Sequence, residues 1–235
     1  MAKYLKVKKV ILKKSTSSFL LIIFGLLSII MLLLTLYGSS SGNFMITTDP
    51  DTFERGIILS TNKDFKDYSP RLFATSMSNV DNITYDSLSF QKVIEAEGDY
   101  IDPYNTYLAY TFYLKNNGKE TVDIEHSLII QEVFRRTEEA VRFILIEDGT
   151  IIRLFRKPDA TPTEYEHKVN REPDEIIEFT GMDVFKYLIV DFKPEEVRQF
   201  SIILYLEGND PDCTDELMGG SLKASMQFKI VEDQE

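Results

Sequence analysis

The sequence predicts an all-β protein, a two-sheet antiparallel sandwich of jelly-roll or Ig-like type, preceded by one N-terminal transmembrane helix. An uncharged apolar run near the N-terminus predicts the helix. A series of short segments with a hydrophobic period of two, separated by turn residues, predicts the strands. No long amphipathic helical pattern follows the apolar run, so a sandwich is favoured over a mixed fold.

The apolar run extends from Phe19 to Tyr37 without a charged residue. As a helix its 19 residues would span roughly 28 Å, close to the thickness of a hydrocarbon core. No acidic residue occurs before Asp49. Because positively charged flanks stay cytoplasmic, we expect a single-pass cell-membrane protein with a cytoplasmic N-terminus and an extracellular C-terminal domain. The positive charges that precede the run are Lys3, Lys6, Lys8, Lys9, Lys13 and Lys14.

A secretory signal peptide has the same order of a basic start, an apolar stretch and small residues, here Ser39 and Ser41. The run exceeds the roughly 7–15 residues usual for a signal peptide and ends in an interfacial tyrosine, which favours an uncleaved anchor. Either alternative exports the remainder. The predicted organisation is a basic cytoplasmic segment 1–17, a transmembrane helix 18–37, a spacer 38–52 and an extracellular β-sandwich 53–233.

The exported part of the chain is strongly acidic. Six of the 26 basic residues precede residue 38, leaving 20 against 38 acidic side chains, a formal charge of −18. This balance argues against nucleic-acid partners and against adsorption to anionic lipid, since both require cationic patches. Cys213 is the single cysteine, so no internal disulfide can stabilise the domain and its core must do so.

The strand pattern is clearest near the C-terminus, where Leu222, Ala224, Met226, Phe228 and Ile230 alternate with polar residues. One buried and one solvated face is typical of an antiparallel sheet. The strongest predicted strands are Tyr107–Leu114, Val122–Ile130, Val141–Ile146, Ile151–Phe155, Lys186–Phe192, Phe200–Leu206 and Leu222–Ile230.

Other segments have weaker patterns. Residues 157–175 are polar with three prolines and are expected to form an exposed insertion. Asn116-Asn117-Gly118 predicts a turn, because Asn and Gly tolerate positive φ. The weaker predicted strands are Phe44–Thr47, Gly56–Ser60 and Leu88–Ile94, and single helical turns are predicted at Thr137–Ala140 and Pro173–Ile177.

The densest polar cluster is residues 207–216, between two of the clearest predicted strands. Asp210, Asp212 and Asp215 are candidate oxygen ligands for Ca²⁺, which takes six to eight oxygens. Their spacing does not match the EF-hand loop, and the alternative is an acidic surface loop without an ion. No other cofactor is expected.

No catalytic set is recognisable in the sequence. A nucleophilic Cys213 would need a histidine base, and the chain has only His126 and His167. His126 lies on the apolar face of a predicted strand, which favours a hydrogen-bonded core residue, and His167 lies in the polar insertion. Zinc-protease, nucleophile-elbow, P-loop and dinucleotide motifs are all absent.

Several stretches together resemble a known family: YGSSSGNFMI, YLAYTFYLKNNGKETVDIEHSLII, EEAVRFILIEDGT and LEGNDPDCTDELMGGSLKASMQF. They are similar to exported surface proteins of Firmicutes related to the TasA/camelysin group. The resemblance implies a jelly-roll-like sandwich at the cell surface or in a biofilm matrix, and implies fibre assembly by strand donation. Camelysin is described as a metalloprotease, but no zinc-ligand pattern is present here.

These observations predict a non-enzymatic, membrane-anchored extracellular protein with a structural, adhesive or matrix role. A calcium-stabilised fibre or assembly module of TasA type is the alternative, and a surface hydrolase is a weaker third. The expected partners are the membrane, through one span, and further copies of the chain or other envelope proteins.

Overall fold

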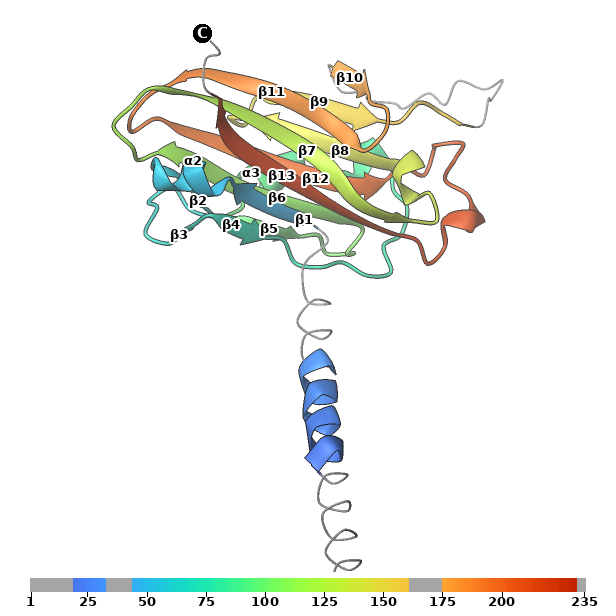
Figure 1. Cartoon of the computed structure of the whole chain (residues 1–235). Coiled ribbons are helices and arrows are strands. Elements are labelled where there is room, and N and C mark those ends of the chain that lie inside the picture. The colour runs from blue at the N-terminus through green and yellow to red at the C-terminus, as the bar shows by residue number, and fades with distance from the viewer. Residues whose placement is uncertain (1–18, 33–43, 161–174, 232–235) are drawn as a thin grey trace, which may run out of the picture. The chain divides into compact units, whose positions relative to one another are not determined.

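A computed structural model describes residues 19–32, 44–160 and 175–231 (Figure 1). The chain divides into two compact units, residues 1–41 and residues 42–235. The described part of the first unit is a helix over residues 19–32. In the described ranges, no helix combines the length and the hydropathy needed to cross a membrane.

The second unit, called the β-domain below, contains the described strands. In chain order they are β1 (Phe44–Thr48), β2 (Ile57–Ser60), β3 (Tyr68–Ser69), β4 (Arg71–Phe73), β5 (Gly98–Ile101), β6 (Tyr107–Asn116), β7 (Val122–Phe134), β8 (Val141–Glu147), β9 (Ile151–Arg156), β10 (Glu175–Glu178), β11 (Asp183–Phe192), β12 (Val197–Leu206) and β13 (Ser221–Val231). They form a five-stranded sheet, β11-β7-β13-β1-β4, and an eight-stranded sheet, β10-β9-β8-β12-β6-β2-β3, in which β5 also pairs with β6.

The two sheets pack face to face (Figure 1), and one core rich in aromatic residues lies between them. The ring centroid of Phe228, on β13 of the first sheet, lies 5.9 Å from that of Phe112 and 5.4 Å from that of Phe200, both on the second sheet. All three side chains are almost fully buried. Removing such large apolar surfaces from water is the main contribution that holds the sheets together. The prediction of a two-sheet, all-β fold is confirmed.

The sheets are mixed, so the prediction of a purely antiparallel sandwich is wrong. β1 runs parallel to β13, with Phe44 opposite Ala224, and β10 runs parallel to β9. Neither pair is joined by a hairpin, so turn residues do not set its direction. β1 also lies within residues 38–52, predicted as a spacer, and its pairing places that strand in the β-domain instead.

Strand β6 of the eight-stranded sheet is covered on both faces. Every residue from Tyr107 to Leu114 in β6 is buried, where alternation had predicted one solvated face. The outer face packs against α3 (Phe90–Ile94) and the 3-10 turn η1 (Tyr85–Ser87). The prediction of a strand at Leu88–Ile94 is therefore wrong, because most of this segment forms the short helix α3. Its Val93 is fully buried against the sheet.

Short helical segments complete the described part of the β-domain. α2 (Pro50–Glu54) begins with a proline, and η3 (Asp215–Leu217) overlaps the end of the acidic cluster. η2 (Thr137–Glu139) confirms the helical turn predicted at Thr137–Ala140. The turn predicted at Pro173–Ile177 is instead strand β10 where it is described, and residues 161–174 of the predicted insertion lie outside the described residues.

Candidate functional site

The acidic cluster begins where β12 ends and is fixed by backbone hydrogen bonds to two other segments. The Glu207 N–H donates to the Ala140 carbonyl at 3.0 Å, and the Gly208 N–H donates to the Ile83 carbonyl at 2.8 Å. The Glu207 carboxylate is buried and accepts from the Tyr205 hydroxyl at 3.2 Å and the Asn209 N–H at 3.1 Å. The loop that follows therefore leaves the sheet in a defined direction.

The side chain of Asp210 is fully enclosed. Its side chain forms an ion pair with the guanidinium of Arg142 on β8, and both side chains are buried. Its other oxygen accepts from the Asp212 N–H at 2.7 Å. Arg142 also donates to the Glu139 carbonyl at 3.3 Å. The pair thus links the acidic loop to β8 and η2.

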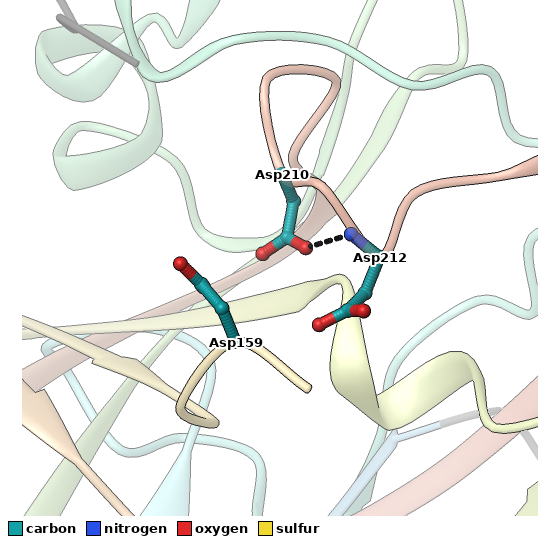
Figure 2. Close-up of side chains that lie close together, drawn as sticks. All are labelled: Asp159, Asp210 and Asp212. Atoms are coloured by element: carbon teal, nitrogen blue, oxygen red, sulfur yellow. Dashed lines mark hydrogen bonds between the residues drawn. The ribbon is translucent and has the colours of Figure 1, made fainter. Parts of the chain in front are cut away.

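Asp212 and Asp159 complete a group of three carboxylates, shown in Figure 2. One oxygen from each of Asp159, Asp210 and Asp212 lies within 4.8 Å of the others. Asp210 and Asp212 are buried, whereas Asp159 is exposed and comes from the segment after β9. The Asp212 carboxylate accepts from the Ala160 N–H at 2.6 Å, which holds the two segments together.

The structure brings together two of the three predicted calcium ligands. Asp215 lies exposed in η3 and is not part of the carboxylate group found among the described residues. The third carboxylate of the group is that of Asp159. Sequence reasoning did not identify it because it is distant along the chain and lies in a stretch assigned to an exposed insertion. An acidic residue in a polar stretch does not by itself indicate that it lies close to Asp210 and Asp212.

Arginine side chains pair with two members of the carboxylate group. Besides Arg142, Arg156 lies 3.5 Å from Asp159, and Lys157 lies 3.1 Å from Glu138. The pKa of Arg136 is raised chiefly by its bond to Glu139, with smaller contributions from Asp212 and Glu138. Both oxygens of Asp210 are already engaged. A hard cation bound here would compete with Arg142 for Asp210, although the oxygen set is of the type that Ca²⁺ takes.

Cys213 lacks the partners of a catalytic thiol in the described part of the chain. Its sulfur accepts from the Asn82 side-chain amide at 3.6 Å, and its backbone N–H donates to the Asp210 carbonyl. His126 is enclosed elsewhere in the core, and His167 lies outside the described residues. The described residues thus hold no thiol–imidazole pair.

His126 is a core residue, as predicted. Neither imidazole nitrogen has a hydrogen-bond partner among the described residues. The nearest carboxylate, Glu147, lies 3.7 Å from Nε2. Four rings surround the imidazole, with centroids at 5.5 to 5.9 Å: Phe185, Tyr187, Phe200 and Phe228.

Glu147 connects this aromatic core to the surface through Arg153, whose guanidinium lies 2.7 Å from it. Burial raises the pKa of the Glu147 carboxyl, but the neighbouring His126 and Arg153 more than offset this, so its pKa lies below the ordinary value of 4.5. The cation of Arg153 also lies over the Tyr187 ring, 4.9 Å from its centroid. These contacts describe a structural network that joins β8, β9 and β11.

Comparisons with known proteins do not identify a family for this chain. No family model matches it. No curated protein matches it in sequence. One solved structure with a similarity is a β-glucosidase from Kluyveromyces marxianus in complex with glucose, at 13% identity and a TM-score of 0.21. The match covers 72% of this chain and 15% of that one, so the chain spans only a small part of the enzyme's length.

Proposed function

We propose that this chain is a membrane-anchored, non-enzymatic β-sandwich protein of the cell surface with a structural, adhesive or matrix role. The observation that carries the proposal is the helix over residues 19–32, whose residues are all exposed. Its large apolar side chains have exposed fractions from 45% to 71%. A helix that is apolar on every side needs either a protein core or lipid around it.

The backbone and the polar group of this helix suit a lipid environment. The hydroxyl of Ser28 donates to the Phe24 carbonyl at 2.9 Å, so it needs no water. The apolar sequence continues beyond the described helix to Tyr37, and six lysines precede it. We infer that the complete run spans the bilayer with the β-domain outside.

A display role fits the β-domain better than catalysis. Its strand β6 is buried on both faces, and its acidic cluster is held by an ion pair and by backbone hydrogen bonds. Kinship to the TasA/camelysin group and a jelly-roll or Ig-like arrangement remain part of this proposal, supported by the sequence segments that resemble that group. A surface hydrolase is disfavoured by the position of His126 away from Cys213.

Fractionation of the full chain tests the anchor. We expect the parent to stay with membranes in alkaline carbonate and to be released by detergent. A variant carrying Ile23→Lys and Leu27→Lys places two charges in the apolar helix, and we expect it to lose membrane association. Release of the parent by carbonate would contradict the proposal.

A calcium-stabilised assembly module is the second candidate, favoured by the convergence of Asp159, Asp210 and Asp212. Thermal unfolding and light scattering of residues 42–235, with and without Ca²⁺, test it. If the site binds, Ca²⁺ raises the Tm of the parent and of Asp215→Asn, but not that of Asp212→Asn. The assembly module also requires larger oligomers in Ca²⁺. An unchanged Tm and a monomer in both conditions would remove this candidate.

A further inference from the structure

The end of β5 and the loop that joins it to β6 present two large apolar side chains to solvent. Ile101 is 79% exposed and Tyr104 is 86% exposed, the two highest values for any large hydrophobic side chain in the described residues. Exposed apolar residues are common singly, but here two lie within four positions of each other along the chain. Phe73, half exposed on β4, adds a third apolar side chain near this end of the domain.

The loop keeps its shape without help from these side chains. One oxygen of the buried Asp102 accepts from the Tyr104 N–H, the Thr106 N–H and the Thr106 hydroxyl at 3.1, 3.1 and 2.9 Å. The Asn105 N–H closes a turn onto the Asp102 carbonyl at 3.0 Å. Because Asp102 supplies the internal bonds, the turn is ordered, with Tyr104 exposed within it and Ile101 exposed at the end of the strand before it.

This loop lies at the end of the β-domain where the chain enters it. The Ala74 N–H donates to the Phe44 carbonyl, at the start of β1, and the next residue, Thr75, bonds the Asp99 carboxylate through its N–H and hydroxyl at 2.9 and 2.8 Å. Asp99 precedes Ile101 by two positions in β5. Figure 1 shows β1, β4 and β5 along the same side of the domain.

The covalent chain limits how far this end lies from the apolar run. Only residues 38–43 separate Tyr37 from Phe44. Fully extended, the chain between the Cα atoms of Tyr37 and Phe44 reaches at most about 25 Å. Since the first strand starts so soon after the apolar run, the loop that adjoins it is within reach of the bilayer that holds the run.

We propose that Ile101 and Tyr104 insert into the interfacial region of the bilayer that carries the anchor and so fix the orientation of the β-domain on the membrane. The proposal rests on the membrane anchorage proposed above. A tyrosine suits the interface because its ring is apolar and its hydroxyl stays hydrated. The exported part carries a formal charge of −18, so attraction to anionic lipid does not drive the contact.

The absence of tryptophan from the sequence allows a direct test with one fluorophore. The full chain with Tyr104→Trp is reconstituted in phosphatidylcholine vesicles, with and without phosphatidylglycerol, and Trp emission is measured with brominated lipid as quencher. Tyr68→Trp is the matched control. Tyr68 is an exposed tyrosine on β3 opposite Ser60, which pairs with Tyr113, whereas Ile101 pairs with Leu108 at the other end of β6.

We expect blue-shifted, quenched emission from Tyr104→Trp in both lipid compositions and water-exposed emission from Tyr68→Trp. Adding Ile101→Ser to Tyr104→Trp should lower the ratio of quenched to unquenched protein by about tenfold. Unquenched emission from Tyr104→Trp in chains that co-float with vesicles would overturn the insertion but not the anchor. Equal quenching at both positions would overturn the specific role of the loop, and failure to co-float would overturn both proposals.

Discussion

The guanidinium of Arg142 and the carboxylate of Asp210 form an ion pair inside the β-domain, with side chains 5% and 0% exposed. The pair joins β8 to the loop after β12, at the centre of the acidic cluster. Each charge is compensated only because the other is present, since neither side chain has appreciable access to water. The acidic cluster is therefore at least a structural link, whether or not a cation also binds there.

Removing one member of this pair should destabilise the β-domain strongly. Arg142→Met leaves Asp210 buried without its cation, and we expect a loss of about 3–5 kcal/mol in the free energy of unfolding. Urea unfolding of residues 42–235 measures it. The control is Arg136→Met, which removes a more exposed pair with Glu139 and should cost less than about 1 kcal/mol. Equal losses for the two variants would contradict the structural role of the buried pair.

Gly118 should not tolerate a side chain. A Cβ at this position would collide with the Arg55 carbonyl oxygen, so Gly118→Ala forces the turn after β6 apart. We expect a loss of about 1–3 kcal/mol in the free energy of unfolding. Gly208→Ala is the control, because its Cβ would make ordinary contacts at 3.5 Å with Asn82. A Gly118→Ala protein as stable as Gly208→Ala would show that the backbone approach is not as close as described.

Acid stability should depend on Glu147. Its folded-state pKa lies below 4.5, so the unfolded chain takes up the proton first as the pH falls. The stabilisation from Glu147 is therefore complete above pH 4.5 and is lost as the pH falls through the folded-state pKa. We expect Glu147→Gln to be less stable at neutral pH and to lose less stability between neutral and acid pH than the parent. Parallel profiles for parent and variant would contradict this account.

Alkaline stability should depend on Tyr110. Burial, with a smaller contribution from Asp99, raises its pKa from 10.0 to about 12. Between these values the unfolded chain releases the phenolic proton and the folded protein keeps it, so stability decreases with rising pH. Tyr110→Phe should flatten that decrease while the free energy of unfolding at neutral pH changes little. Denaturant unfolding from neutral to alkaline pH measures it, and an unchanged alkaline slope would contradict the burial of this hydroxyl.

The strands could be predicted from the sequence where apolar residues at every second position are the buried ones. β7 buries Ile124, His126 and Leu128 and leaves the residues between them partly exposed, as the sequence pattern predicts. The pattern led to a wrong prediction at α3, where a strand was expected. A short apolar run does not distinguish a strand from a helix, and here Val93 is apolar because this helix packs against the sheet. The turn at Gly118 was predicted because Asn and Gly tolerate positive φ. In the structure Gly118 does not have a positive φ, and glycine is required there because a Cβ would collide with the Arg55 carbonyl oxygen.

The candidate site was only partly predictable because it depends on tertiary contacts. Asp210 and Asp212 are two positions apart, so their proximity follows from the local turn. Arg142 lies on β8 and Asp159 follows β9, so the folding of these strands brings both residues to Asp210. No local pattern in the sequence predicts this proximity. The parallel direction of β1 against β13 is similarly a long-range outcome that turn residues do not determine.

The most direct test of the central claim is the topology of the full chain in intact cells. An epitope tag is placed at each terminus, and cells are treated with a protease that does not cross the membrane. Anchorage with an external β-domain predicts loss of the C-terminal tag and protection of the N-terminal tag, with the N-terminal fragment retained in the membrane. Protection of both tags in intact cells, or a soluble chain carrying both, would contradict the account.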